Sequence, residues 1–216
     1  MLILLPPSEG KNQPISKAQV NLAKLVFPKE LLEIRSRLLT KALAASPAAK
    51  AMDVYTGVLY QALDWKTLSP AAKARGEKSV LITSAIFGVL RPSDLIPNYK
   101  AKIKTSDWKA TLKPALDGLE ADLIIDCRSS TYAGVWQSPP ANTVAVRVFK
   151  KEKGKISVIT HLSKKYRGEL TRSILKSGKP PKTPAELLAI AEKYFDCKLI
   201  KAKGNQPWYL DLVINS

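Results

Sequence analysis

The sequence predicts an α+β or irregular mixed α/β fold. Short apolar runs typical of buried strands alternate with segments of helical periodicity, but without the regular strand–helix–strand rhythm of a fully parallel sheet. The 216 residues are 45% hydrophobic and 25% charged, which is the composition of an ordinary globular protein with a full core. We therefore expect one domain over residues 1–216.

The first expected strand is Leu2–Leu5, which stops at two prolines. The polar sequence SEGK follows at residues 8–11, and a glycine-containing loop after a buried strand is a common position for a functional site. The glycine spacing of a phosphate-binding P-loop is missing. The alternative is that the prolines only end the strand and that Ser8 and Glu9 face solvent.

Residues 28–45 have the clearest helical periodicity of the first half, with one apolar face. An aromatic segment at 53–60 and a second apolar strand at 79–83 come next. This strand leads through a glycine turn into an Arg-Pro-x-Asp loop. In that loop we expect Arg91 and Asp94 to brace each other or, where partly buried, to orient Arg91 towards an anionic ligand.

After an expected helix at 107–116, a third apolar strand at 122–127 leads into the polar loop RSSTY at 128–132. Three expected strands thus end in polar loops, and these loops converge on one cleft if the strands are neighbours. The candidate residues of that cleft are Ser8, Glu9, Lys11, Tyr55, Arg91, Arg128, Ser129, Ser130 and Tyr132.

Residues 143–161 alternate between apolar and polar side chains on either side of a turn at 151–154, a pattern that predicts an antiparallel hairpin. Two closing strands are expected at 197–200 and 209–214. The only histidine, His161, and the two cysteines show no metal-ligand or CxxC spacing. We therefore expect neither a metal site nor a cofactor nor a disulfide framework.

Residues 162–189 are expected to form two helices. Apolar residues recur every four positions in the first, at Leu162, Tyr166, Leu170 and Ile174, which predicts one inward face. Gly178 is placed to end this helix, while Thr183 and Glu186 form an N-terminal cap for the next. Helix N-terminal N–H groups flanked by Lys and Arg suit a phosphate. The alternative is an ordinary solvated basic face.

The charge is unusually positive, with 35 Lys and Arg against 18 Asp and Glu, a net charge of +17. Residues 147–182 alone hold 12 basic and 2 acidic residues, so the chain should attract polyanions such as DNA, RNA or nucleotides. No apolar run approaches the roughly 20 residues that span a bilayer, and the N-terminus lacks the basic region of a secretion signal. We expect a cytoplasmic protein that does not bind membranes.

Five segments of the chain together resemble the YaaA family of bacterial peroxide-stress-resistance proteins. They occur in the family's order: MLILLPPSEGK at 1–11, DVYTGVLY at 53–60, FGVLRPSDLIPNY at 87–99, RSSTY at 128–132 and KKYRGELTR at 164–172. The better-studied branch has a Ser-Pro-Ala-Lys pattern at the N-terminus and a second glycine where this chain has Ala85. The resemblance is therefore to a different branch.

The resemblance implies a compact single domain with strands wrapped by helices, a basic cleft and a helix-hairpin-helix element. We expect that element at about 162–195, with the turn at 83–94 as the competing candidate. A Lys- and Pro-rich loop at 178–182 stands where many such elements have a glycine-rich hairpin. The expected phosphate contacts are Lys164, Lys165, Arg167, Arg172, Lys176, Lys179 and Lys182.

The first hypothesis is that of a monomeric, non-enzymatic protein that binds double-stranded DNA without strong sequence preference. The resemblance implies that it limits oxidative DNA damage during peroxide stress and influences intracellular iron. The second hypothesis is an enzyme acting on a nucleotide or nucleic acid in the cleft, with Glu9 as general base and Arg91 as anion clamp. A third is a basic scaffold for another protein.

Overall fold

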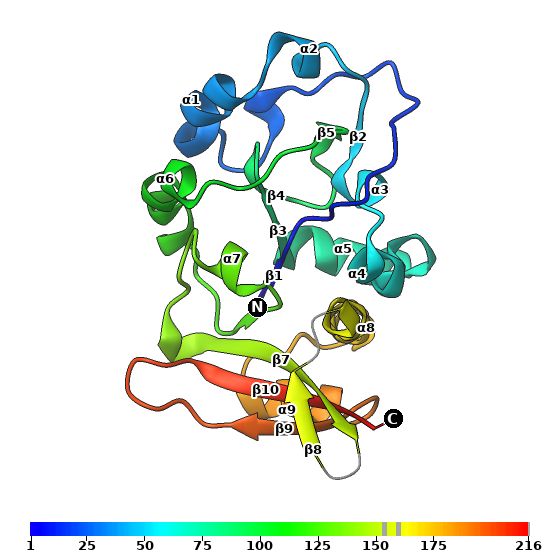
Figure 1. The fold of residues 1–216 in the computed structure, drawn as a ribbon, viewed down its shortest axis with the longest axis vertical. Coiled ribbons are helices and arrows are strands. Elements are labelled where there is room, and N and C mark those ends of the chain that lie inside the picture. The colour runs from blue at the N-terminus through cyan, green and yellow to red at the C-terminus, as the bar shows by residue number, and fades with distance from the viewer. Residues whose placement is uncertain (153–154, 159–160, 216) are drawn as a thin grey trace.

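The apolar run at the N-terminus is an interior strand of a mixed sheet in the computed structural model, which describes residues 1–152, 155–158 and 161–215 (Figure 1). The strand order is β4-β3-β1-β6-β7-β10-β9, and β8 pairs with β7. The strands are β1 (Leu2–Leu5), β3 (Val80–Ser84), β4 (Gly88–Leu90), β6 (Ile124–Asp126), β7 (Thr143–Glu152), β8 (Lys155–Val158), β9 (Asp196–Ile200) and β10 (Trp208–Asn215).

The middle of this sheet is parallel. β1 pairs in parallel with β3 on one side and β6 on the other, and β6, β7 and β10 continue in the same direction. β4, β8 and β9 are antiparallel to their neighbours. The chain goes from β1 to β3 and then crosses to β6, so its direction of winding reverses between β1 and β6. The predicted mixed α/β class is confirmed.

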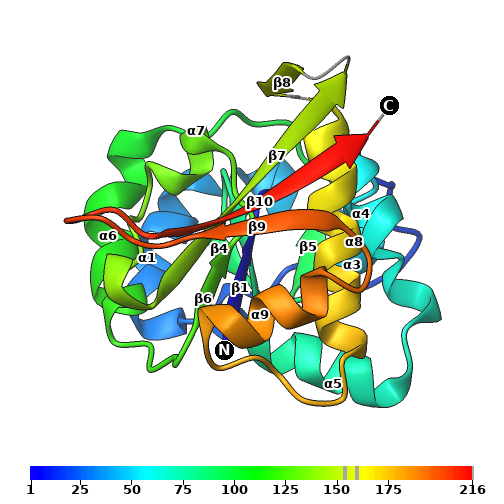
Figure 2. The same cartoon turned by 90° about the horizontal axis from the view of Figure 1, so that it is seen from below.

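Helices cover both faces of the sheet (Figure 2). They are α1 (Pro28–Leu38), α2 (Lys41–Ala44), α3 (Ala51–Val54), α4 (Val58–Leu63), α5 (Pro70–Ser79), α6 (Thr105–Asp117), α7 (Ser130–Ala133), α8 (His161–Lys176) and α9 (Pro184–Ala191). A separate two-stranded sheet pairs β2 (Ala48–Lys50) with β5 (Leu95–Pro97). No helix within the described ranges is both long and apolar enough to cross a bilayer.

Burial on both faces explains why β1 is continuously apolar. Ile3 and Leu5 point into a core formed with α4, α5 and α8. Leu2 and Leu4 point the opposite way, into a second core formed with α1 and α6. Successive side chains of a strand alternate between faces, so each residue of this run has an apolar neighbour.

The predicted helix at 28–45 is two helices, α1 and α2. Thr40 separates them because its hydroxyl accepts a hydrogen bond from the Leu43 N–H at 3.2 Å and so caps the second helix. Arg35 lies among the buried residues of α1, where its Nε donates to Phe87 O and its Nη2 to Val89 O, both at 2.9 Å. Burial lowers the pKa of this guanidinium to about 10.

The predicted hairpin is confirmed by the antiparallel pairing of β7 with β8. Residues 153–154 of its turn and the side chain of His161 lie outside the described part of the structure. The two closing strands are also confirmed, as β9 and β10.

The predicted helix pair is present as α8 and α9, and Thr183 Oγ1 accepts the predicted capping bond from the Glu186 N–H at 3.2 Å. The expectation that Leu162 points inward is wrong, since it is 42% exposed. The inward face consists of Leu170, Ile174 and Leu175, and the predicted Tyr166 packs half-buried against the same core. The assignment of this connection as a helix-hairpin-helix stays a prediction.

Candidate functional site

The loops that follow β1, β3 and β6 leave the same edge of the sheet, because these strands are parallel neighbours. They carry SEGK at 8–11, the turn at 84–87 and RSSTY at 128–132. The winding reverses between β1 and β6 at this edge, and open α/β sheets bind ligands in a crevice at such a reversal. We name this region the crevice.

Arg91 is not part of the crevice, which corrects its expected role there. β4 runs back along β3, with Gly88 opposite Ser84 and Leu90 opposite Ile82, so the residue after β4 lies towards the amino end of β3. The Arg91 guanidinium donates to Lys78 O at 2.7 Å. Asp94 braces the loop through its Oδ2, which accepts the Arg91 backbone N–H at 2.8 Å.

The loop after β1 is tied to the aromatic segment at 53–60. Ser8 is 6% exposed, and its Oγ accepts the Gly57 N–H at 2.7 Å. A Cβ at Gly57 would lie 2.4 Å from that oxygen, so only glycine allows this approach. Lys11 forms a backbone bridge with Tyr55, and the Tyr60 hydroxyl donates to Pro6 O at 2.7 Å.

A chain of buried hydroxyl groups lies behind this loop. Tyr55 OH and Tyr99 OH are 2.8 Å apart, and Tyr99 OH lies 2.7 Å from Ser84 Oγ. Burial raises the pKa of Tyr55 and Tyr60 well above the ordinary value and that of Tyr99 to about 12. The three phenols therefore stay protonated at neutral pH. Tyr60, Ser84 and Tyr99 were not predicted, although all three flank predicted loops.

Lys11 places an ammonium group against these aromatic rings. Its Nζ donates to Ser8 O at 2.7 Å and lies 4.4 Å from the ring centre of Tyr99 and 5.6 Å from that of Tyr55. Partial burial lowers the pKa of Lys11, and the charge of nearby Glu9 opposes this shift. Within the described residues no carboxylate lies within 4 Å of this ammonium. Its other two N–H groups form no hydrogen bond with a described residue.

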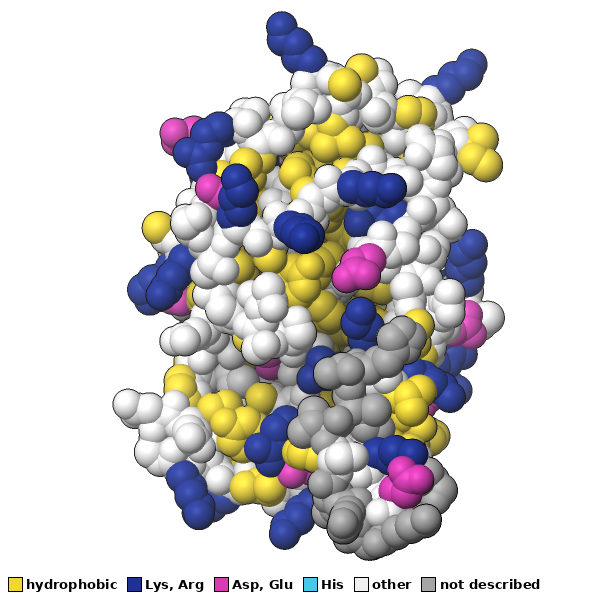
Figure 3. Space-filling model, in the orientation of Figure 1, with side chains coloured by type: hydrophobic (Ala, Val, Ile, Leu, Met, Phe, Trp, Pro, Cys, Tyr) yellow, Lys and Arg dark blue, Asp and Glu magenta, His cyan; other side chains and the backbone are white. Residues whose placement is uncertain are grey.

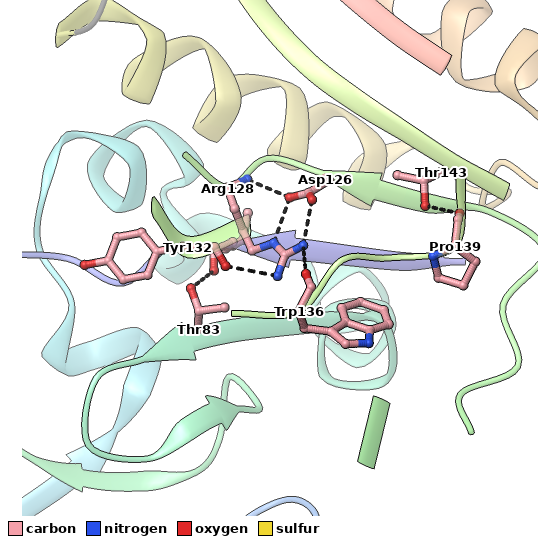
Figure 4. Close-up of polar contacts among 8 residues, drawn as sticks. Thr83, Asp126, Arg128, Tyr132, Trp136, Pro139 and Thr143 are labelled. Atoms are coloured by element: carbon pink, nitrogen blue, oxygen red, sulfur yellow. Dashed lines mark hydrogen bonds and ion pairs between the residues drawn. The ribbon is translucent and has the colours of Figure 1, made fainter. Parts of the chain in front are cut away.

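Arg128 braces the third loop from inside (Figure 4). Its side chain is 1% exposed, its Nε and Nη2 bond to the Asp126 carboxylate at 2.9 and 2.7 Å, and Nη2 also donates to Trp136 O at 2.9 Å. These bonds use the guanidinium internally, so Arg128 positions the loop and does not contact a ligand. Ser129 is half-buried and Ser130 exposed at the start of α7.

Tyr132 points its ring away from this bonded core (Figure 4). Burial raises its pKa, and the charge of Glu9 raises it further. The phenol and this carboxylate are therefore close enough to interact. Glu9 itself is exposed. The crevice therefore combines a cation at Lys11, a carboxylate at Glu9 and a neutral phenol at Tyr132. Such a set can orient a polar ligand and transfer a proton.

The molecular surface is hollowed on the face shown in Figure 3. Hydrophobic side chains floor a hollow along the middle of this face, and basic and acidic side chains stand along its edges. Among the residues that the structure describes, no group of three or more His, Cys, Asp or Glu side chains is placed to hold a metal ion.

Two of the seven expected phosphate contacts are used inside the protein, which corrects their expected role. Arg167 Nη2 donates to Val146 O at 3.1 Å, and its Nε is buried without a hydrogen-bond partner in the described part of the chain. Arg172 Nη1 donates to Leu63 O at 3.0 Å and Asp64 O at 2.7 Å. These arginines attach α8 to β7 and to the end of α4.

The remaining five candidates are exposed lysines: Lys164, Lys165, Lys176, Lys179 and Lys182. We refer to them as the lysine row. Lys165 lies 3.7 Å from the Glu169 carboxylate, and the other four form no ion pair with a described residue. This row is the exposed positive charge of the helix pair.

The N-terminus of α9 already has an anionic group, contrary to the expectation of a phosphate there. Glu186 Oε2 accepts the Lys182 backbone N–H at 2.6 Å, and this bond lowers the pKa of Glu186. The Gly178 N–H also bonds internally, to Lys176 O at 3.0 Å. Phosphate contacts at this connection would therefore use lysine side chains in place of these two amides.

Comparison with known proteins gives consistent matches along the chain. Residues 1–198 match the family model described as peroxide stress protein YaaA. The chain is 32% identical to a UPF0246 protein of Streptomyces coelicolor, in an alignment that covers 100% of this chain and 99% of the relative. It is 34% identical to a UPF0246 protein of Corynebacterium efficiens over 88% and 91% of the two chains. An uncharacterized protein of Campylobacter jejuni is 30% identical over 94% and 96%.

Proposed function

This chain belongs to the YaaA family of peroxide stress proteins, and we propose that it binds duplex DNA through lysine–phosphate contacts and so limits oxidative DNA damage. The lysine row on α8 and on the connection from α8 to α9 is the observation that carries the proposal. Ammonium groups attract phosphates and release their counterions without reading bases. We expect affinity without strong sequence preference.

The surrounding charge supports this proposal. The chain carries a net charge of +17. The ammonium groups of four lysines of the row have no carboxylate within 4 Å among the described residues, and Glu186 interacts with those of Lys179 and Lys182 only over a longer distance. An approaching phosphate therefore displaces water and counterions but breaks no ion pair at these four positions. Arg167 and Arg172 act indirectly, because they hold α8 in place.

Removing three lysines of the row is expected to flatten the salt dependence of DNA binding. A variant with Lys164→Ala, Lys165→Ala and Lys179→Ala loses three phosphate contacts. Each contact contributes about 0.9 to the slope of log affinity against log salt concentration, so the slope should fall by about 2.7. Titration of a short fluorescent duplex at several salt concentrations measures the slope.

A matched variant controls for the loss of charge. Lys17, Lys29 and Lys41 are also exposed. Lys29 is on α1 and Lys41 on α2, which lie at the far end of the molecule from α8 (Figure 1), and Lys17 is close to α2 because Gln19 bonds to Ala45 O. Replacing these three with alanine removes the same charge and should leave the slope nearly unchanged. Equal slopes in the two variants, or no duplex binding by the wild type at physiological salt, would contradict the proposal.

The protective part of the proposal is tested with the same two variants in peroxide-treated cells. We also propose, as the family resemblance implies, that the protein lowers intracellular iron, so lesions in DNA and iron content are both measured. The lysine-row variant should protect DNA less than the control variant does. Full protection of DNA by the lysine-row variant would contradict the proposal that the protein protects DNA by binding it through these lysines.

The crevice favours a second candidate function, an enzyme acting on a nucleotide or nucleic acid. The specific observation is the Lys11 ammonium, which has no carboxylate within 4 Å among the described residues and shares the crevice with Glu9 and Tyr132. In this candidate function Lys11 would bind the anionic group of the substrate, the role that the sequence alone predicts for Arg91. Glu9 would act as general base.

For this candidate, Glu9→Gln is expected to lower the turnover rate by about 10²- to 10⁴-fold, the usual contribution of a general base. Lys11→Met should mainly weaken substrate binding, and neither change should alter the salt slope of duplex binding. Product formation is followed by chromatography with labelled nucleoside triphosphates and oligonucleotides, with Lys17→Met as the control. No turnover of these substrates by the wild type would eliminate the enzyme candidate.

A further inference from the structure

A surface groove of about 290 Å³ lies between α8 and the turn that follows α9. Its walls include Glu169 and Lys176 from α8, and Tyr194 and Phe195 from the turn. This volume is at the lower end of the range for small-molecule pockets, so the groove has room for one ring system and not for a duplex. The groove borders the lysine row, because Lys176 belongs to both.

Tyr194 lines this groove with an exposed aromatic ring. It is 60% exposed, and it is the only aromatic among the large hydrophobic residues with exposed side chains in the part of the chain that the structure describes. The adjacent Phe195 packs inward, edge-on to Tyr166 at 6.4 Å between ring centres. The core contact of this turn therefore comes from Phe195, which leaves the Tyr194 ring accessible to a ligand.

The charges beside the ring favour an anionic ligand. Lys176 is exposed and forms no ion pair with a described residue. The Glu169 carboxylate lies 3.7 Å from Lys165, which partly neutralises it. A flat ring stacked on Tyr194 could thus have a phosphate next to Lys176.

We propose that this groove binds an unpaired nucleobase of single-stranded nucleic acid, stacked on Tyr194 with its phosphate at Lys176. In a duplex the faces of each base are covered by its neighbours, so only an unpaired base offers a face to the ring. Stacking on an exposed aromatic is the usual way in which proteins hold single strands without sequence preference. This inference rests on the proposed DNA-binding function and adds a preferred form of the ligand.

The test compares Tyr194→Ala with Tyr194→Phe on a fluorescent oligothymidylate and on a duplex of the same length. Tyr194→Ala should weaken single-strand binding about tenfold, the loss of one stacked base, and change duplex binding less than twofold. Tyr194→Phe keeps the ring and should bind like the wild type. Because Tyr194 does not contact phosphate, the salt slope should not change, whereas Lys176→Ala should flatten the single-strand slope by about 0.7.

A second readout reports the stacking itself. An oligothymidylate with one 2-aminopurine should lose fluorescence on binding to the wild type and to Tyr194→Phe, but not to Tyr194→Ala. If Tyr194→Ala weakens the single strand no more than the duplex, or if the wild type binds only duplex, this inference is wrong and the proposed function stands. If the wild type binds neither form, both are wrong.

Discussion

Replacing Arg128 with methionine is expected to lower the free energy of unfolding by about 3–5 kcal/mol. The guanidinium lies inside the loop after β6 and bonds to both oxygens of the Asp126 carboxylate, at 2.9 and 2.7 Å. Methionine preserves much of the volume but leaves this carboxylate without its cation. An uncompensated buried charge costs more than the intact pair contributes, because its desolvation is no longer offset. Urea denaturation of the purified variant measures the change.

The pair Arg37–Asp107 provides the matched control for this substitution. These groups lie 3.9 Å apart, and the Arg37 side chain is 67% exposed, so Arg37→Met should cost less than about 1 kcal/mol. The double variant Arg128→Met, Asp126→Leu removes the buried charge together with its partner and should recover part of the stability. Equal losses in Arg128→Met and Arg37→Met would contradict the assigned role of Arg128.

Replacing Arg128 should also loosen the loop that carries Tyr132 into the crevice. Arg128 donates to Trp136 O at 2.9 Å and to Tyr132 O at 3.3 Å, and both carbonyls lose a donor in the variant. The loop that carries the Tyr132 ring then has fewer bonds to the sheet. The same carbonyl bonds explain why the double variant should not recover full stability.

The parts of the fold that could be predicted have local causes. An apolar run that ends at two prolines is a buried strand whatever its partners, and β1 is one. Thr183 followed by proline and then Glu186 forms a helix cap from its own atoms. Arg35 could not be predicted in the same way. The carbonyls of Phe87 and Val89 that hold it come from a segment more than 50 positions along the chain.

The candidate site also depends on contacts between residues far apart in the sequence, which could not be predicted. The predicted loops come together because β1, β3 and β6 are neighbours in the sheet. The sequence does not show in which direction the strand before Arg91 runs, so it could not show at which edge of the sheet Arg91 lies. Because β4 turns back along β3, Arg91 is carried away from the crevice. Tyr55 and Tyr99 are 44 positions apart and share a hydrogen bond only in the folded chain. Spacing also does not distinguish an exposed lysine from an arginine used internally, such as Arg172.

Replacing Gly168 with valine is expected to lower the free energy of unfolding by about 3 kcal/mol, the upper part of the range for overpacked sites. A Cβ at this position would lie 2.2 Å from Leu59 O and 3.0 Å from the Ala62 Cβ, both on α4. The nearer atom belongs to the backbone, so no side-chain rotation relieves the overlap. α4 and α8 must move apart, which exposes the apolar core between them. Thermal and urea denaturation measure the loss.

Helix propensity alone predicts the opposite effect for Gly168→Ala, so measuring the stability of this variant distinguishes the two effects. Glycine costs a helix interior about 1 kcal/mol relative to alanine, so Gly168→Ala would stabilise α8 if the helix were isolated. In the protein the overlap with Leu59 O should outweigh this gain, and Gly168→Ala should still destabilise. Gly178 has no atom within 4 Å of an added Cβ, and Gly178→Ala should change stability by less than about 0.5 kcal/mol. A Gly168→Ala variant more stable than the wild type would show that α4 and α8 separate easily. In that case α8 would not hold the lysine row in the fixed position that the proposed DNA contacts require.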